Sequence, residues 1–404
     1  MIKRTLQELC LNITDGKHGD CENEENSGYY FISCKDIFDG QINYKNARQI
    51  TKADFEETHK RTMLEVDDIL LTNSGTIGRM AFVTDREATT KTTFQKSVAI
   101  IKPDKQKVLP RYLYYQLQNC VPQFINSSNG SAQKNLLLST MRTFQIEIEE
   151  NREKQEKIAN TLSAYDDLIE NNQKQIKLLE EAAQRLYKEW FVDLRFPEHE
   201  NTKIVDGVPE GGKKNCAEKF FEITIGKTPP RTEKRCFTTG KNGIPWVSIA
   251  DMGNSGMFVL NTAENLTDDA IKQYNVKVIP KNAVLLSFKL TVGRVAIAPN
   301  DICTNEAIAH FKGRRECERE YTYFYLKNFH YDELGSTSSI SKAVNSKIIK
   351  AMPFIMPSEK LLKEYSSKTK DIFDLIICKQ KMDNNLKIAR DRILHKLMSG
   401  EVEV

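Results

Sequence analysis

Residues 151–195 constrain the fold of this chain more than any other stretch. They include no glycine and no proline, and their apolar residues recur at alternating steps of three and four. This period of 3.5 residues is typical of a helix that packs along a second helix in a coiled coil, not of a helix lying on a globular core. The predicted contact positions, with a polar interruption at Asn172, are Ile158, Leu162, Tyr165, Ile169, Asn172, Ile176, Leu179, Ala183, Leu186 and Trp190.

A matching segment, residues 358–400, lies near the end of the chain. An offset of 207 residues aligns Asp167-Leu168-Ile169 with Asp374-Leu375-Ile376, and it places Lys379 opposite Asn172 in the alignment. A polar residue in such a seam commonly fixes the register of two helices at some cost in stability. The alternative is two unrelated amphipathic helices. The predicted contact positions of the second segment are Ile372, Leu375, Lys379, Met382, Leu386, Ala389, Ile393 and Leu397.

The regions before the two helices repeat the same order of features, which argues against unrelated helices. In the first region, strand-like segments, a Gly-Arg loop, a short helix-like segment and a polar loop follow one another, at 29–33, 68–72, 73–79, 110–118, 127–135 and 144–148. In the second region, the corresponding segments are 244–248, 283–287, 291–296, 338–342 and 353–357. We therefore predict an α/β (α+β) protein with two duplicated domains, residues 1–150 and 196–352, and two helical spacers, residues 151–195 and 353–404.

The composition indicates an ordinary globular protein. The 404 residues are 40% hydrophobic and 28% charged, and no apolar run approaches the length of a membrane span. The first residues, Met1-Ile2-Lys3-Arg4, do not begin a signal peptide. Nine scattered cysteines without a CxxC pair argue against a disulfide framework or a zinc site. We expect a cytoplasmic protein.

The search for catalytic chemistry excludes the common sites. Residues 207–213 have the spacing of a phosphate-binding loop, but Lys214 stands where a metal-binding Ser or Thr is needed. There is no GxGxxG motif and no HExxH motif, and the six histidines are dispersed. We expect no catalytic residue, no metal site and no cofactor bound by this chain.

Several polar loops are instead suited to contacting double-stranded DNA. Glycine allows backbone N–H groups to approach phosphates, and Arg and Asn can bind base edges in the major groove. The net charge of +4 is small, so DNA binding would depend on local patches. The candidates in the first domain are Lys17, His18, Asn73, Ser74, Thr76, Arg79, Ser131, Gln133, Lys134 and Asn135. Those in the second domain are Lys227, Arg231, Lys289, Thr291, Arg294, Asn305, Ser339, Ser341 and Lys342.

Each of these residues also has a purely structural interpretation. Each could be an ordinary hairpin or loop residue, with glycine present for the turn geometry. At the level of the whole chain, the alternative is a non-catalytic scaffold whose duplicated domains bind proteins instead of DNA. The duplication of the loops as a group favours the DNA interpretation.

Several motifs carry a family resemblance. They are Tyr187-Lys188-Glu189-Trp190-Phe191-Val192-Asp193-Leu194-Arg195-Phe196-Pro197, Gly207-Val208-Pro209-Glu210-Gly211, Gly243-Ile244-Pro245-Trp246-Val247-Ser248, Lys154-Gln155-Glu156-Lys157-Ile158-Ala159 and Gly75-Thr76-Ile77-Gly78-Arg79. With these motifs the whole chain resembles the specificity subunit of type I restriction–modification systems. It departs from the family at Gly212, where the linker motif usually continues with Trp, and at Lys342, which interrupts the second polar loop.

The resemblance implies a fold, a function and partners. Two target-recognition domains would be separated by two long antiparallel helices that form a coiled coil. Each domain would read one half of a split DNA target, and the helices would bind two methyltransferase subunits. S-adenosylmethionine, ATP and Mg²⁺ are expected on those methyltransferase subunits and on restriction/translocase subunits. The chain itself would direct adenine methylation and DNA cleavage without catalysing either.

Overall fold

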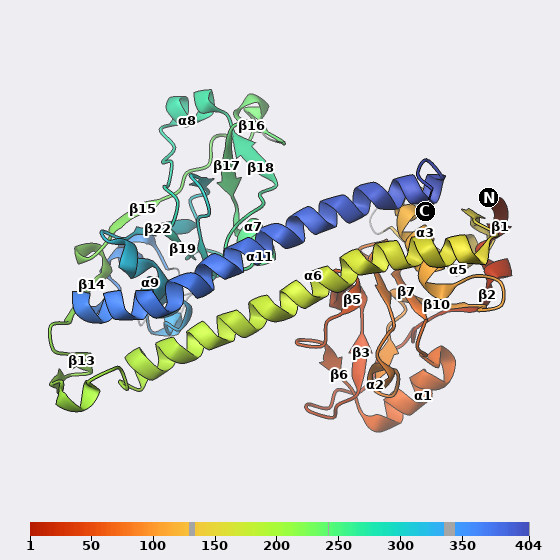
Figure 1. Ribbon diagram of the computed structural model, residues 1–404, viewed down its shortest axis with the longest axis horizontal. Coiled ribbons are helices and arrows are strands. Elements are labelled where there is room, and N and C mark those ends of the chain that lie inside the picture. The colour runs from red at the N-terminus through yellow and green to blue at the C-terminus, as the bar shows by residue number, and fades with distance from the viewer. Residues whose placement is uncertain (129–133, 241, 335–343, 404) are drawn as a thin grey trace. The chain divides into compact units, whose positions relative to one another are not determined.

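The computed structural model describes residues 1–128, 134–240, 242–334 and 344–403, and these form two compact units (Figure 1). Unit 1 consists of residues 1–168 and 387–404, and unit 2 consists of residues 169–386. Two long helices contribute to both units, α6 (Arg152–Tyr187) and α11 (Glu359–Ser399), and α6 continues as a π-helical turn, η3 (Lys188–Val192). Both predicted long helices are thus confirmed. In the described part of the chain, no helix combines the length and apolarity that crossing a bilayer requires.

Unit 1 has a four-stranded antiparallel sheet in the order β2-β10-β7-β8 and a three-stranded sheet in the order β6-β3-β9. Two further pairs, β1-β11 and β4-β5, complete its β structure. Its strands are β1 (Ile2–Thr5), β2 (Cys10–Asp15), β3 (Tyr30–Ile32), β4 (Ile37–Phe38), β5 (Gln41–Ile42), β6 (Arg48–Gln49), β7 (Ile69–Thr72), β8 (Met80–Phe82), β9 (Thr92–Phe94), β10 (Val98–Pro103) and β11 (Gln145–Ile148). Its helices besides α6 and α11 are η1 (Leu6–Leu9), η2 (Cys34–Asp36), α1 (Lys52–Thr62), α2 (Arg86–Thr89), α3 (Pro110–Asn119), α4 (Val121–Asn126) and α5 (Leu138–Thr143).

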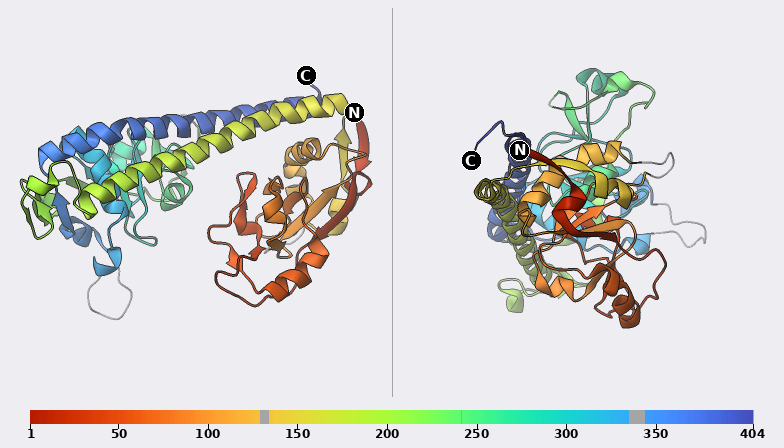
Figure 2. Two further views of the ribbon diagram at one scale, coloured as in Figure 1. Left: turned by 60° about the horizontal axis from the view of Figure 1, so that its bottom comes forward. Right: turned by 90° about the vertical axis from the view of Figure 1, so that its right-hand side faces the viewer.

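The central strand β10 explains how unit 1 forms two cores. Successive side chains of a strand point to opposite faces of the sheet. Ala99 and Ile101 accordingly pack with α3 and the start of α6, whereas Val98 and Ile100 pack against the three-stranded sheet. All four are fully buried, and so this strand is a continuous apolar run. Helix α1 lies on the far side of the sheets from α6 (Figure 2).

Unit 2 repeats this plan. Its four-stranded sheet has the order β15-β22-β19-β20, and a second sheet has the order β16-β18-β17-β21. Its strands are β12 (Ile204–Val205), β13 (Val208–Pro209), β14 (Lys213–Cys216), β15 (Glu222–Ile225), β16 (Phe237–Thr238), β17 (Ile244–Val247), β18 (Glu264–Leu266), β19 (Val284–Ser287), β20 (Val295–Ile297), β21 (Cys303–Thr304), β22 (Ile308–Lys312) and β23 (Pro353–Met356). Its further helices are η4 (His199–Asn201), η5 (Ala217–Lys219), η6 (Lys234–Cys236), α7 (Ile249–Asn254), α8 (Asp268–Tyr274), η7 (Glu316–Glu318), α9 (Arg319–Lys327), η8 (Tyr331–Leu334) and α10 (Ser346–Ala351).

Matching elements confirm that the two α/β regions are copies of one fold. In each, a parallel pair of strands, β3-β9 or β17-β21, accompanies the antiparallel four-stranded sheet. In each, the strand that precedes the long helix pairs with a strand near the start of the copy, as β1-β11 or β14-β23. The predicted duplication is therefore present at the level of strand pairing.

The long helices pack side by side and antiparallel within each unit (Figures 1 and 2). In unit 2, Asn172 contacts Lys379, and Trp190 contacts Tyr365, so the numbering rises along α6 while it falls along α11. In unit 1, Ile158 and Leu162 share one core with Leu394 and Leu397. The expected antiparallel arrangement is thus observed in both units.

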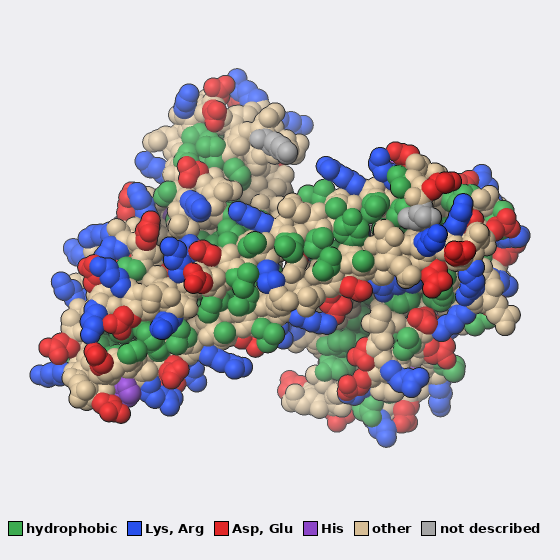
Figure 3. Space-filling view, viewed as in Figure 1, with side chains coloured by type: hydrophobic (Ala, Val, Ile, Leu, Met, Phe, Trp, Pro, Cys, Tyr) green, Lys and Arg blue, Asp and Glu red, His purple; other side chains and the backbone are tan. Residues whose placement is uncertain are grey.

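Two of the predicted contact positions of α11 lie outside its contact face. Leu375 and Met382 are 44% and 47% exposed, whereas Phe373 and Ile376 are fully buried. Apolar side chains are accordingly visible on the surface over α11 (Figure 3). Near the middle of α11, Gln380 faces the globular part of unit 2, and its Oε1 accepts a hydrogen bond from Phe258 N at 3.2 Å. Apolar periodicity cannot detect a polar contact of this kind.

Candidate nucleic-acid interface

The Gly-Arg loops after β7 and β19 have the same hydrogen-bonded frame. In unit 1, the Thr72 hydroxyl donates to Thr76 O and accepts from Arg79 N at 2.9 Å. In unit 2, the Ser287 hydroxyl donates to Thr291 O at 2.6 Å and accepts from Arg294 N at 3.0 Å. One hydroxyl therefore closes the turn in each copy, and it holds the tip of the loop in a fixed position.

The two arginines of these loops also occupy equivalent sites. Arg79 Nη1 donates to Cys34 O at 3.4 Å, and Arg294 Nη1 donates to Ile249 O at 2.6 Å. Each accepting residue directly follows a serine, Ser33 or Ser248, that forms a capping box. Each guanidinium thus has a structural bond, and its other N–H groups remain as donors because arginine has five. Arg79 is exposed and Arg294 is half-buried.

A second pair of equivalent loops follows β2 and β15. Lys17 N donates to Phe94 O at 2.8 Å, and Lys227 N donates to Thr304 O at 2.9 Å. The preceding Gly16 lies so close to the backbone that an added Cβ would be 1.9 Å from Phe94 O. Glycine is required there because the two chain segments touch. Lys17 and Lys227 are therefore placed alike in the two copies.

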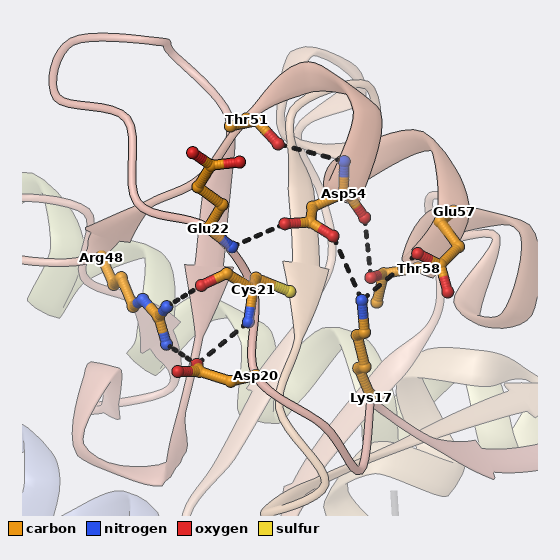
Figure 4. Close-up of polar contacts among 9 residues, drawn as sticks. All are labelled: Lys17, Asp20, Cys21, Glu22, Arg48, Thr51, Asp54, Glu57 and Thr58. Atoms are coloured by element: carbon orange, nitrogen blue, oxygen red, sulfur yellow. Dashed lines mark hydrogen bonds and ion pairs between the residues drawn. The ribbon is translucent and has the colours of Figure 1, made fainter.

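The side chain of Lys17 is not available as a free cation. Its Nζ lies 3.2 Å from Asp54 Oδ1 and 3.3 Å from Glu57 Oε2, both on α1 (Figure 4). Burial alone would lower the pKa of Lys17, but the hydrogen bonds to the two carboxylates outweigh it and raise that pKa. Lys227 Nζ instead donates to Tyr274 O at 2.6 Å. The prediction did not foresee these intramolecular partners.

Two other candidates are held by neighbouring acidic groups. His18 Nε2 lies 2.9 Å from Asp15 Oδ2, and Arg61 pairs with the same carboxylate. Arg231 Nη1 lies 2.6 Å from Glu264 Oε2, and its guanidinium stacks 4.6 Å from the Trp246 ring. Of the two, the His18 side chain is 60% exposed and that of Arg231 is 53% exposed. Both can still be reached from solvent.

The remaining candidates divide into buried and displayed residues. Asn73 is buried, so its side chain does not reach solvent. Its main chain is hydrogen-bonded to Ser97 O and Leu136 N. Ser74 bridges Asn135, which brings the Gly-Arg loop and the polar loop of unit 1 together. The side chain of Asn305 closes its own turn by accepting from Ala307 N at 3.1 Å. The exposed candidates are Thr76, Lys134, Asn135, Lys289 and Thr291. The predicted residues Ser131, Gln133, Ser339, Ser341 and Lys342 lie outside the described residues.

Sequence reasoning missed two residues on these loops. Lys96 is exposed, and its N–H donates to Lys17 O at 3.1 Å, which places it between the Lys17 loop and the Gly-Arg loop. Leu290 is 98% exposed at the tip of the second Gly-Arg loop. The equivalent positions of the other copy carry Glu306 and Gly75, so the only sequence signal was a difference between the copies.

Within the described ranges, no three His, Cys, Asp or Glu side chains come together as a metal site. The arrangement that the structure does provide is a pair of rigid, polar, glycine-containing loops at the end of each four-stranded sheet. Such loops can approach a phosphate backbone and present side chains to base edges.

Comparison with known proteins assigns the family. The family model described as the type I restriction modification DNA specificity domain matches residues 3–181 and matches again at residues 209–386. The chain belongs to this family.

Relatives in the type I specificity family extend over nearly the whole chain. The MjaIX specificity subunit of Methanocaldococcus jannaschii is 28% identical over 392 residues, which cover 93% of this chain and 87% of that protein. The putative MjaX specificity subunit of the same organism is 25% identical over 415 residues, which cover 99% of this chain and 93% of that protein. The crystal structure of a type I S subunit from M. genitalium superposes with a TM-score of 0.58 at 15% identity, over 98% of this chain and 95% of that chain. This last likeness shows a shared fold.

Proposed function

We propose that this chain is a non-catalytic, cytoplasmic targeting subunit that reads a bipartite DNA sequence, one half-site with each domain. The domain of residues 1–150 would recognise one half-site and the domain of residues 196–352 the other. Two methyltransferase subunits would bind the helical spacers and carry S-adenosylmethionine. Restriction/translocase subunits would supply ATP- and Mg²⁺-dependent cleavage. The chain itself would bind no cofactor.

The observation that carries this proposal is one loop frame that displays different side chains in its two copies. Thr72 and Ser287 close equivalent turns with equivalent hydrogen bonds. The tip of the first turn is Ser74-Gly75-Thr76, whereas the tip of the second is Lys289-Leu290-Thr291. Two domains that recognise different base sequences need loops of the same backbone structure with different side chains at their tips. Base edges specify the sequence, whereas phosphates only position the protein.

An exchange experiment tests the division of labour between the domains. Residues 1–150 are replaced by the corresponding residues of another specificity subunit, and the exchanged chain is produced with its methyltransferase subunits. Methylome sequencing should show that one half of the methylated motif changes and the other half stays. If both halves change together, the two domains do not read DNA independently.

A binding measurement separates DNA recognition from the protein-scaffold alternative. The affinity of the complex for its methylated motif should fall steeply with salt, since phosphate contacts release counterions. A scaffold would show no sequence-specific, salt-dependent affinity for DNA.

A further inference from the structure

Leu290 is the most exposed large apolar residue of unit 2 in the described part of the chain, at 98%. It stands at the tip of the turn between β19 and β20, and Val292 in the same turn is 38% exposed. A single exposed leucine is common on protein surfaces and carries no meaning by itself. Its backbone conformation is the second observation.

The backbone of Leu290 is strained. Its φ is +62°, and Thr291 N donates to Lys289 O at 2.7 Å, which closes a three-residue γ-turn centred on Leu290. The form of this turn with positive φ is rare and strained for residues other than glycine. The first copy has Gly75 at the equivalent place, with a φ of +77°. Glycine adopts such angles without a steric cost. The second copy therefore has a leucine at a position where the backbone of the turn favours glycine.

The turn holds Leu290 rigidly. Gly293 N donates to Ser287 O at 3.0 Å, and the Ser287 hydroxyl binds Thr291 O at 2.6 Å. On the other side, Phe288 is 1% exposed and belongs to the core, and its N–H donates to Ala307 O at 2.9 Å. The leucine side chain is thus presented to solvent from a fixed base. Strain of this kind persists where the surrounding structure over-determines it, and it clusters at functional sites.

We propose that Leu290 makes an apolar contact with the DNA bases of the half-site read by residues 196–352. This inference rests on the proposed DNA-reading function. A two-stranded β-ribbon fits the major groove, where an apolar side chain can cover the C5 methyl group of thymine. Leucine is also among the side chains that insert between base steps. In both arrangements the side chain leaves water for an apolar face of a base, while Lys289 and Thr291 beside it provide polar contacts.

The test uses the full chain in complex with its methyltransferase subunits and a duplex of the motif found by methylome sequencing. Leu290→Gly should leave the midpoint of unfolding unchanged or raise it, because glycine suits the turn. Its affinity for the duplex should nevertheless fall at least tenfold, since a whole leucine side chain loses its apolar contact. Leu290→Asn should give the same loss, because asparagine tolerates positive φ but is polar. Leu11→Asn is the matched control, since Leu11 in β2 is 73% exposed, and its affinity should be unchanged.

Modified bases identify the contact. Replacing single thymines of the half-site with deoxyuridine should weaken wild-type binding three- to fivefold at one position, the effect of one buried methyl group, and should not affect Leu290→Gly. If the side chain inserts between bases, 2-aminopurine at the step should instead fluoresce more strongly with the wild-type complex than with Leu290→Gly. Equal affinity of wild type and Leu290→Gly, or no response to either modified base, would overturn the inference. A wild-type complex without sequence-specific DNA binding would overturn the proposed function itself, and the inference with it.

Discussion

Lys379 Nζ donates a hydrogen bond to Asn172 Oδ1 at 3.3 Å, and these two residues are equivalent positions of the repeated helices, 207 residues apart. Two copies of one helix that pack antiparallel bring equivalent positions together at one level only. At that level the polar interruption of each seam faces the other. Asn172 is 5% exposed, and its Nδ2 has no hydrogen-bond partner among the described residues. Each polar residue is thus tolerated chiefly because of its counterpart.

This pairing predicts that a single variant loses stability and that a double variant regains it. Lys379→Met should lower the free energy of unfolding by about 1–3 kcal/mol, because a buried amide oxygen loses its donor. Asn172→Leu combined with Lys379→Met should recover this loss or exceed wild-type stability, since two matched apolar groups can replace a buried polar pair. Fluorescence during denaturation measures the change, because Trp190 and Trp246 are both in unit 2. A double variant no more stable than the single one would contradict this account.

A second polar cluster joins the helices of unit 1. Asp166 Oδ2 accepts from the Tyr115 hydroxyl at 2.6 Å, and Asp166 Oδ1 lies 2.7 Å from Arg390 Nη1. The Asp166 and Arg390 side chains are each 21% exposed, so solvent screens this pair only partly. Burial alone would lower the pKa of Arg390, but its bonds to Asp166 and Asp391 outweigh it and raise that pKa.

Asp166→Ala should therefore destabilise unit 1 by about 2–3 kcal/mol, the loss of two bonds to one partly buried charge. Hydrogen exchange of the peptides from residues 387–399 measures it, because α11 should open more often in that segment. Asp167→Ala is the matched control on the exposed side of the same helix. Equal exchange in the two variants would show that Asp166 does not stabilise the helix pair.

His310 makes the stability of unit 2 depend on pH. The ring is 1% exposed, with Nδ1 2.9 Å from Thr224 Oγ1 and Nε2 2.6 Å from Thr304 Oγ1. Burial lowers the pKa of His310 to about 3. Between about pH 3 and 6.5 the unfolded chain binds a proton that the folded chain does not, so stability falls as the pH falls through this window.

The expected loss is roughly 2.3 kcal/mol between pH 6.5 and 4.5 for this one proton, since the unfolded imidazole is only half protonated at pH 6.5. His310→Gln should remove this contribution to the pH dependence of the unfolding free energy, since glutamine does not titrate. His330→Gln, at an exposed histidine of the same unit, should retain it. Tryptophan fluorescence at a series of pH values provides the measurement, and identical slopes in the two variants would rule out the assignment.

The fold was predictable from the sequence because its main signals are local or repeated. The long helices show as glycine-free, proline-free periodic stretches, and the duplication shows as the same order of motifs in each half. The contact face of α11 was predictable only in part. Positions such as Gln380 and Arg390 are polar, and only their tertiary partners, Phe258 N and Asp166, show that they face inward.

The site was predictable only in part, for a related reason. The Gly-Arg loops were found, but not that the Arg79 and Arg294 side chains each bind a carbonyl 45 residues away. The charge of Lys17 indicates a DNA contact, yet its carboxylate partners lie 37 and 40 residues later on α1. Leu290 was not predictable, because its positive φ is a property of the folded turn and its side chain is not polar.

The last prediction concerns Arg79 and Arg294. These residues are identical in the two copies and bind equivalent carbonyls, whereas the tips of their loops differ. If the two domains read different bases, identical residues in one frame should contact what both half-sites share, which is the phosphate backbone.

Arg79→Ala and Arg294→Ala should each weaken binding to all DNA sequences alike and lower the salt slope by about one, with the methylated motif unchanged. Arg86→Ala, at an exposed arginine of unit 1 in α2, is the matched control for Arg79. An arginine that binds a base edge would instead relax one position of the motif and cost about 1–3 kcal/mol against the preferred base. Salt titration of affinity, together with methylome sequencing of each variant, distinguishes the two roles.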